Sequence, residues 1–171
     1  MTTRQFPSYD ETSAPPAAQG ALAHTKRAFG GIPVPLQRYA SAPAMLSAAL
    51  NALEQFEQTS LTPLEREVVA MTMGRVNGCH FCIDLHRRLL RSQHAPATLI
   101  AALEAGTALE DRRLEALREF VEAALRERGD VPEVTWVAFR EAGFSHAQAL
   151  EVMMGISAYT LTTFTNRLIE A

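Results

Sequence analysis

The only two cysteines of this 171-residue chain, Cys79 and Cys82, are separated by two residues, and His86 follows four positions after the second. Asn77 and Gly78 interrupt an apolar segment just upstream, so a new helix is predicted to begin at the cysteines. Positions i, i+3 and i+7 then share one helix face. The first turn of a helix favours an anion, and a nearby histidine can accept a proton. This pattern is suited to reversible thiol–disulfide chemistry.

A carboxylate upstream of the cysteines is the second notable feature. Residues 63–76 are apolar on nearly every side, which predicts a central, enclosed helix, and Glu67 projects from a face of small apolar residues. Glu67 can hold the imidazole of His86 in one tautomer and stabilise it when charged. An ion pair with an arginine, such as Arg75 or Arg87, is the alternative partner for a buried acid here.

Helices are the elements that must position these residues. No segment carries sustained strict alternation of apolar and polar residues, so we predict an all-α fold: a bundle of about seven to eight helices with the cysteine pair at the start of a central helix. A short helical turn is expected at 36–40. The predicted helices are 17–29, 43–58, 63–76, 79–92, 96–106, 111–128, 132–142 and 145–169.

Two helix starts carry a specific signal. Thr62 with Glu65, and Ser145 with Gln148, have the spacing of a capping box, in which each side chain accepts a hydrogen bond from the backbone N–H of the other residue. Glu65 and its neighbour Arg66 are expected at the surface because they lie at a helix start.

The N-terminus differs in composition from the rest. Residues 1–16 are polar, contain three prolines and show no periodicity, so they are predicted to form a flexible arm. Residues 17–171 are predicted to form a single helical domain, which is long enough to bury a core.

Composition narrows the class of protein. Hydrophobic residues make up 47% and charged residues 20%, as in ordinary globular proteins, and the net charge of −3 argues against a nucleic-acid partner. No apolar run approaches the ~20 residues that span a bilayer, which argues against a membrane protein. Residues 1–13 lack the apolar region of a secretory signal, so a cytoplasmic location is expected. In a reducing compartment a CxxC pair is more often catalytic or metal-binding than structural.

Several motifs, taken together, form a recognisable pattern from about residue 20 to the end. They are Phe29-Gly30-Gly31-Ile32-Pro33, Leu64-Glu65-Arg66-Glu67, Asn77-Gly78-Cys79, Phe81-Cys82, His86, Ala142-Gly143-Phe144-Ser145 and Phe164-Thr165-Asn166-Arg167-Leu168. With them the chain resembles the AhpD-like alkylhydroperoxidase and carboxymuconolactone decarboxylase superfamily, in its peroxidase-related branch. The resemblance implies an all-α AhpD-like fold, a homo-oligomer, and a dithiol peroxidase or related oxidoreductase that uses no cofactor or metal.

The resemblance also implies roles for four residues. Cys82, close to His86, would attack a hydroperoxide to give a sulfenic acid, and Cys79 would condense with it to form a disulfide. The helix-start position alone would favour Cys79 as the attacking residue. Glu67 would complete the proton relay, and a lipoyl group or a thioredoxin-like protein would reduce the disulfide. The best-known members have a histidine immediately before the second cysteine, where this chain has Phe81.

Other interpretations of the same residues stay open at this point. Two cysteines can simply fill a core. Cys79, His80, Cys82 and His86 offer zinc ligands, but all four lie on one helix, which cannot surround a tetrahedral ion alone. A decarboxylase-type enzyme acting on a carboxylated lactone is a further alternative, although such members do not depend on a thiol pair. A redox-sensing or interaction protein, whose disulfide switches a binding surface, is the non-enzymatic alternative.

The last predicted helix is more apolar than one core requires. Ile156, Tyr159 and Phe164 are therefore expected to contribute to a subunit interface.

Overall fold

Nine helices follow one another along residues 5–170, the part of the chain that the computed structural model describes, and no strand occurs among these residues. Their bounds are α1 (Pro16–Phe29), α2 (Val34–Tyr39), α3 (Pro43–Glu57), α4 (Pro63–Val76), α5 (His80–Ser92), α6 (Ala97–Ala105), α7 (Arg112–Arg126), α8 (Glu133–Glu141) and α9 (His146–Leu168). The all-α prediction is confirmed. The helix expected at 63–76 has those bounds, and the short turn expected at 36–40 is α2. In this part of the chain every helix is too short or too polar to span a lipid bilayer.

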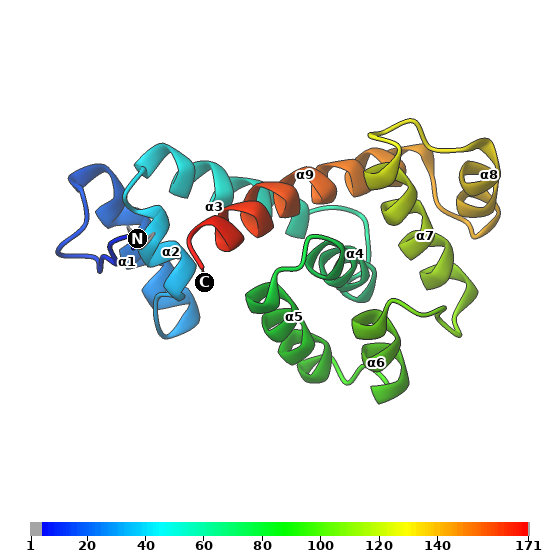
Figure 1. Ribbon diagram of the computed structural model, residues 1–171, viewed down its shortest axis with the longest axis horizontal. Helices are drawn as coiled ribbons and strands as arrows, with labels where there is room; N and C mark the ends of the chain where they lie inside the picture. Colours follow the sequence, from blue (N-terminus) through cyan, green and yellow to red (C-terminus); the bar gives the residue numbers. More distant parts are fainter. Residues whose placement is uncertain (1–4, 171) are drawn as a thin grey trace.

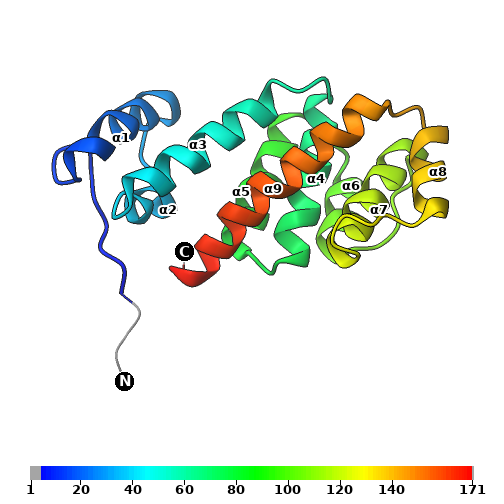
Figure 2. The same cartoon turned by 90° about the horizontal axis from the view of Figure 1, so that it is seen from above.

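The long helix α9 connects the two ends of the elongated structure. It runs from α8 at one end to α2 at the other, antiparallel to α3 (Figures 1 and 2). Helices α3 and α9 pack against each other, and α4 lies against α9 as well. The C-terminal half of α9 is thereby placed between α2 and the start of α5.

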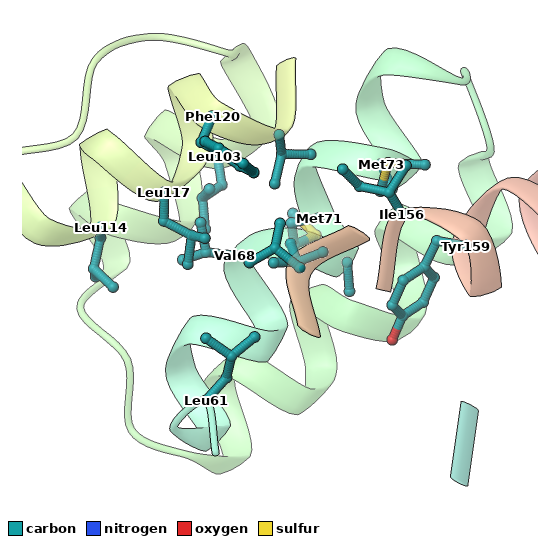
Figure 3. Packing of buried hydrophobic residues seen from close by; sticks show 14 of the residues in the cluster. Leu61, Val68, Met71, Met73, Leu103, Leu114, Leu117, Phe120, Ile156 and Tyr159 are labelled. Atoms are coloured by element: carbon teal, nitrogen blue, oxygen red, sulfur yellow. The ribbon is translucent and has the colours of Figure 1, made fainter. Parts of the chain in front are cut away.

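Helix α4 is enclosed by α3, α5, α6, α7 and α9, as its apolar sequence predicts. Val68, Met71 and Met73 are completely buried, and they join residues of α6, α7 and α9 in the larger hydrophobic cluster (Figure 3). A helix packed on all sides holds its side chains in fixed positions, since close-packed interiors leave little free volume. Glu67 therefore projects from a rigid element.

A smaller hydrophobic cluster joins the N-terminal helices to the end of α9. It includes Leu22 of α1, Tyr39 of α2, Leu46 of α3 and Ile169, which follows α9. This cluster fixes the position of α2 relative to the C-terminal turn of α9, a contact that becomes important at the site.

The predicted N-terminal arm, 1–16, falls partly outside the described residues, which begin at residue 5. In the described part, the carboxylate of Asp10 accepts hydrogen bonds from the backbone N–H groups of Thr12 and Ser13, and Glu11 pairs with Lys26 of α1. Flexibility of the arm, and a single domain from residue 17 onward, stay predictions.

Both capping boxes are present. Thr62 and Glu65 exchange hydrogen bonds at the start of α4, and Ser145 and Gln148 do so at the start of α9. The surface position expected for Glu65 is wrong. Its carboxylate is buried because, besides the cap, it accepts a hydrogen bond from Nε of Arg113 on α7 at 2.7 Å.

The apolar face of α9 serves the chain's own core to a larger extent than expected. Ile156 and Tyr159 are buried within the larger cluster, so their expected role in a subunit interface is wrong. Tyr159 meets Phe56 of α3 edge to face, at 5.9 Å between ring centroids. Phe164, by contrast, is exposed.

A glycine allows the close crossing of α3 and α9. A Cβ atom at Gly155 would lie 2.5 Å from Cε2 of Phe56, whose ring is completely buried. We expect Gly155→Ala to lower the free energy of unfolding by about 1–3 kcal/mol, because overpacking outweighs the ~0.5–1 kcal/mol that alanine contributes in a helix. Equilibrium unfolding in urea measures the change.

The matched control for that substitution is Gly20→Ala in α1, where nothing lies within 4 Å of the added Cβ. It is expected to stabilise the protein slightly. If Gly155→Ala is as stable as the wild-type protein or more stable, the crossing of α3 and α9 can accommodate a Cβ atom at this position.

Candidate functional site

The connection between α4 and α5 positions the first cysteine. Gly78 adopts a left-handed conformation, with φ of 64°, and the N–H of Cys79 donates to the carbonyl of Gly74 at 2.8 Å while the N–H of Gly78 donates to that of Arg75 at 3.0 Å. These two bonds form a Schellman motif, the standard glycine-dependent end of a helix. Cys79 is at the same time the N-cap of α5. A single residue therefore ends one helix and begins the next.

The two sulfur atoms lie together at the start of α5, and Cys79 and Cys82 are paired as a disulfide with Cα atoms 5.4 Å apart. Sγ of Cys79 accepts a hydrogen bond from the N–H of Cys82 at 3.3 Å. Cys79 is 1% exposed and Cys82 is 4% exposed. Burial raises the pKa of a thiol, whereas the helix N-terminus lowers it, so the environment acts on the thiolate in both directions.

The close approach of α5 to α4 depends on Gly74. A Cβ atom there would lie 3.3 Å from Cβ of Cys82. The absence of a side chain at this position lets the cysteine helix pack directly on the central helix.

Glu67 and His86 form a buried pair. Nδ1 of His86 lies 2.9 Å from Oε2 of Glu67, and both residues are 6% exposed. The arginines considered as alternative partners bind elsewhere: Arg75 pairs with Glu122 of α7, and Arg87 with Asp84 and Glu104. The carboxylate therefore orients the imidazole, with Nδ1 directed at Glu67 and the other ring nitrogen left for another partner.

Cys82 and His86 lie one turn apart on the buried face of α5. The structure thus brings together the four residues expected from the sequence: the two cysteines at the helix start, the histidine one turn later and the glutamate of α4 against it. Their roles in catalysis stay a prediction.

Tyr159 of α9 also contacts this group. Its ring meets the imidazole of His86 edge to face, at 5.3 Å between centroids. Burial, and secondly the charge of Glu67, raise the pKa of the Tyr159 hydroxyl well above its ordinary value. The phenol therefore stays neutral beside the pair.

Sequence reasoning missed a further contact to the sulfurs. The side-chain amide of Asn166, on α9, donates to Sγ of Cys82 at 3.3 Å and approaches Sγ of Cys79 at 3.6 Å. The hydroxyl of Tyr39 donates to Oδ1 of the same amide. The motif at 164–168 contains Asn166 but assigns it no role. A usable signal was present, because Tyr159, Thr162, Thr163 and Asn166 form a stripe of polar groups at helical spacing in an otherwise apolar helix.

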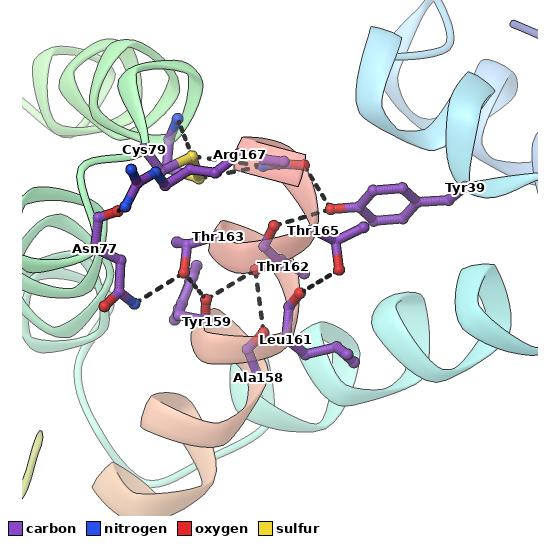
Figure 4. Close-up of a disulfide and its surroundings, with 12 residues drawn as sticks. Tyr39, Asn77, Cys79, Ala158, Tyr159, Leu161, Thr162, Thr163, Thr165 and Arg167 are labelled. Carbon is purple, nitrogen blue, oxygen red and sulfur yellow. Dashed lines mark hydrogen bonds between the residues drawn. A yellow bond between two sulfur atoms is a disulfide. The ribbon is translucent and has the colours of Figure 1, made fainter. Parts of the chain in front are cut away.

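Helix α9 also holds the turn that precedes the cysteines (Figure 4). Nη1 of Arg167 donates to the carbonyl of Asn77 at 2.9 Å, and Nδ2 of Asn77 donates to Oγ1 of Thr163 at 2.9 Å. The turn is therefore fixed to α9 by two hydrogen bonds.

The residues considered as zinc ligands do not all lie together. His80 is exposed at the start of α5, while the sulfurs and His86 are buried. Phe81, where the best-known relatives have histidine, is partly buried. Within residues 5–170, no three His, Cys, Asp or Glu side chains are arranged to hold a metal ion.

Fold and site together define an all-α protein with a buried CxxC pair at the start of α5, a helix that packs on the central helix α4. The chain belongs to the Carboxymuconolactone decarboxylase family, whose sequence profile matches residues 40–125. This confirms the resemblance found from the sequence motifs. No curated protein sequence matches the chain significantly.

Solved structures support the assignment of the fold. The AhpD core of an uncharacterized peroxidase-related protein from Ralstonia eutropha JMP134 superimposes with a TM-score of 0.84 at 18% identity, covering 95% of this chain and 88% of that one. A peroxidase-related protein from Silicibacter sp. TM1040 gives 0.81 at 20% identity, covering 96% and 87%. The debrominase Bmp8, bound to 2,3,4-tribromopyrrole, gives 0.74 at 13% identity, covering 91% and 84%. At these identities the likeness concerns the fold.

Proposed function

We propose that the protein is a dithiol peroxidase, an oxidoreductase that reduces hydroperoxides through the Cys79–Cys82 pair. The observation that carries the proposal is the paired sulfurs at the start of α5 together with the Glu67–His86 hydrogen bond on the same two packed helices. A thiol pair alone is compatible with core packing, but a buried carboxylate–imidazole pair beside it is the arrangement of a base held in position.

In the first step the Cys82 thiolate attacks the terminal oxygen of a hydroperoxide. A sulfur–oxygen bond forms as the oxygen–oxygen bond breaks, so Cys82 becomes a sulfenic acid and the substrate is reduced to an alkoxide, or to hydroxide when it is hydrogen peroxide. The proton that His86 took from the thiol passes to this leaving group, which departs as an alcohol or water. Glu67 stabilises the charged imidazole in the interval.

In the second step the thiol of Cys79 attacks the sulfur of the sulfenic acid, a disulfide forms and water leaves. An external dithiol then reduces this disulfide by exchange and becomes a disulfide itself. A lipoyl group or a thioredoxin-like protein has the required chemistry. Helix geometry already places the two cysteines within bonding reach, so the closure needs no movement of helices.

The alternatives are less well supported. Decarboxylation of a carboxylated lactone, as in the family's name, makes no use of a thiol pair, whereas here the pair is the best-defined feature of the site. A redox sensor without catalysis uses the same disulfide but has no need of the buried Glu67–His86 pair.

Two further expectations belong to this proposal. The reaction takes place in the cytoplasm, where dithiol reductants are available. The protein acts as a homo-oligomer, because Leu85 and Leu89 of α5 and Phe164 and Leu168 of α9 leave apolar side chains exposed near the site. No nucleic acid or membrane is expected as a partner.

The test is a stopped-flow titration of the reduced protein with hydrogen peroxide and with an organic hydroperoxide, combined with thiol counting. We expect two thiols to be lost per chain, with fast and saturable kinetics. If the protein thiols react with peroxide no faster than a free thiol does, the peroxidase function is contradicted and a sensor is favoured.

A further inference from the structure

We propose that Asn166 is a catalytic residue: its amide donates hydrogen bonds to the sulfur pair and stabilises the Cys82 thiolate, while Tyr39 is the positioning residue that holds this amide in the donating orientation. The inference deepens the proposed function and rests on it for the identity of the reacting sulfur. Nothing in the CxxC motif itself assigns a role to either residue.

The contact is buried and specific. Nδ2 of Asn166 lies 3.3 Å from Sγ of Cys82 and 3.6 Å from Sγ of Cys79, and the asparagine is 3% exposed. Hydrogen bonds to sulfur are long, so both distances fall within their range, and the two N–H bonds of one amide can serve two sulfurs. A thiolate accepts such a bond more strongly than a disulfide sulfur does, because its charge is full.

The orientation of the amide follows from its surroundings. As a disulfide or a thiolate, the sulfurs carry no hydrogen and can only accept. A carbonyl oxygen turned toward them would be buried without a donor, and a thiolate would repel it. The opposite orientation gives every group a partner, since Oδ1 of Asn166 then accepts from the hydroxyl of Tyr39.

Tyr39 is suited to fixing this orientation. It is 3% exposed and reaches from α2 to the end of α9 beside the disulfide (Figure 4). Its hydroxyl also lies 3.0 Å from the carbonyl of Thr162, a second acceptor. Burial raises the pKa of this phenol well above its ordinary value, so the hydroxyl keeps its proton and remains a donor.

Other charged or titratable groups surround the pair from each packed element, and their effects must be separated from that of the amide. They are Glu67 of α4, His86 of α5, Tyr159 and Arg167 of α9, and Tyr39 of α2. Arg167 donates to the backbone carbonyl of Asn77. Asn166 supplies the neutral side-chain donor that reaches the sulfurs, beside the backbone N–H of Cys82, which donates to Sγ of Cys79.

Two measurable properties follow. The amide lowers the pKa of the reactive thiol, because it stabilises the thiolate and not the thiol. It also favours the reduced pair, since only the reduced form contains a thiolate. A tenfold loss of that preference makes the reduction potential about 30 mV more negative.

The experiment uses the full-length reduced protein and iodoacetamide, which alkylates the thiolate, over a series of pH values. For Asn166→Ala we expect the midpoint of the alkylation profile to rise by about one pH unit, as for loss of a hydrogen bond to a charged group. Asn166→Asp, which places an acceptor against the sulfurs, is expected to raise it further. Tyr39→Phe, which keeps the ring, is expected to give an intermediate rise.

Thr165→Val is the matched control. Oγ1 of Thr165 lies on the same helix but donates to the carbonyl of Leu161, away from the sulfurs, so its removal should leave the profile unchanged. The reduction potential, measured by equilibration with glutathione buffers, is a second readout. A loss of packing alone would not shift it in the same order among the variants. If Asn166→Ala fails to fold, Tyr39→Phe carries the test.

Wild-type profiles for Asn166→Ala and Tyr39→Phe would overturn the inference, as would an equal rise in Thr165→Val. This outcome is independent of the proposed activity, because alkylation needs no peroxide. If the protein is inert toward peroxides but the alkylation midpoint rises in the expected order among the variants, the inference about the thiolate still holds. If the protein reduces peroxides rapidly but the variants keep the wild-type midpoint, only the roles of Asn166 and Tyr39 are removed.

Discussion

Replacing Cys82 with serine is expected to reduce peroxide consumption to the uncatalysed background, whereas replacing Cys79 with serine is expected to leave one rapid oxidation per chain and no turnover. A serine hydroxyl stays protonated near neutral pH and cannot replace the thiolate as nucleophile. Without Cys79, the sulfenic acid of Cys82 has no thiol with which to condense and accumulates. Serine differs from cysteine only by oxygen in place of sulfur, so neither substitution at the start of α5 is expected to move a helix.

Trapping with dimedone, followed by mass spectrometry of the peptide that contains both positions, distinguishes the two variants. The adduct should appear on Cys82 in Cys79→Ser and be absent from Cys82→Ser. The reverse pattern would assign the attack to Cys79, which as N-cap residue already accepts a backbone N–H bond.

Glu67→Gln is expected to raise the pKa of the reactive thiol and to slow its reaction with peroxide at pH 7 by about tenfold. The substitution keeps the size of the side chain but removes the charge that stabilises a protonated His86 at 2.9 Å. A hydrogen bond to a charged group contributes about 1.5–3 kcal/mol, and 1.36 kcal/mol corresponds to one pKa unit. Because the thiolate becomes harder to form, the loss of rate should shrink as pH rises.

Glu65→Gln is the matched control for that substitution. Glu65 is also buried on α4, but its carboxylate serves the cap at Thr62 and the ion pair with Arg113. Glutamine retains the cap. This variant should lose stability through the ion pair and keep the wild-type pH profile of alkylation. An unchanged profile in Glu67→Gln would remove Glu67 from the mechanism.

Local patterns in the sequence were sufficient for most of the fold. Proline at the first turn, capping boxes and glycine ends are short-range signals, and they place α4 and α9 within a residue or two of the observed bounds. Such local patterns do not show which residue of another helix pairs with a given side chain. The prediction of a surface position for Glu65 failed because its partner, Arg113, lies on another helix.

The same distinction applies to the site. Cys79, Cys82 and His86 belong to one helix and its N-cap, so their spacing alone predicted that they share a face of it. Asn166 and Tyr39 contact each other across 127 residues of sequence, and no periodicity reports such a contact. Only the packing of the smaller cluster, which joins α2 to the end of α9, brings them together.

The segment that matches the family profile, 40–125, contains all four residues predicted from the motif, whereas Tyr39 and Asn166 lie outside it. The two sulfur atoms and the amide that contacts them therefore come from different segments of the chain. In this protein the cysteine pair is local in the sequence, whereas the surroundings of its sulfur atoms depend on how α2 and α9 pack beside the start of α5.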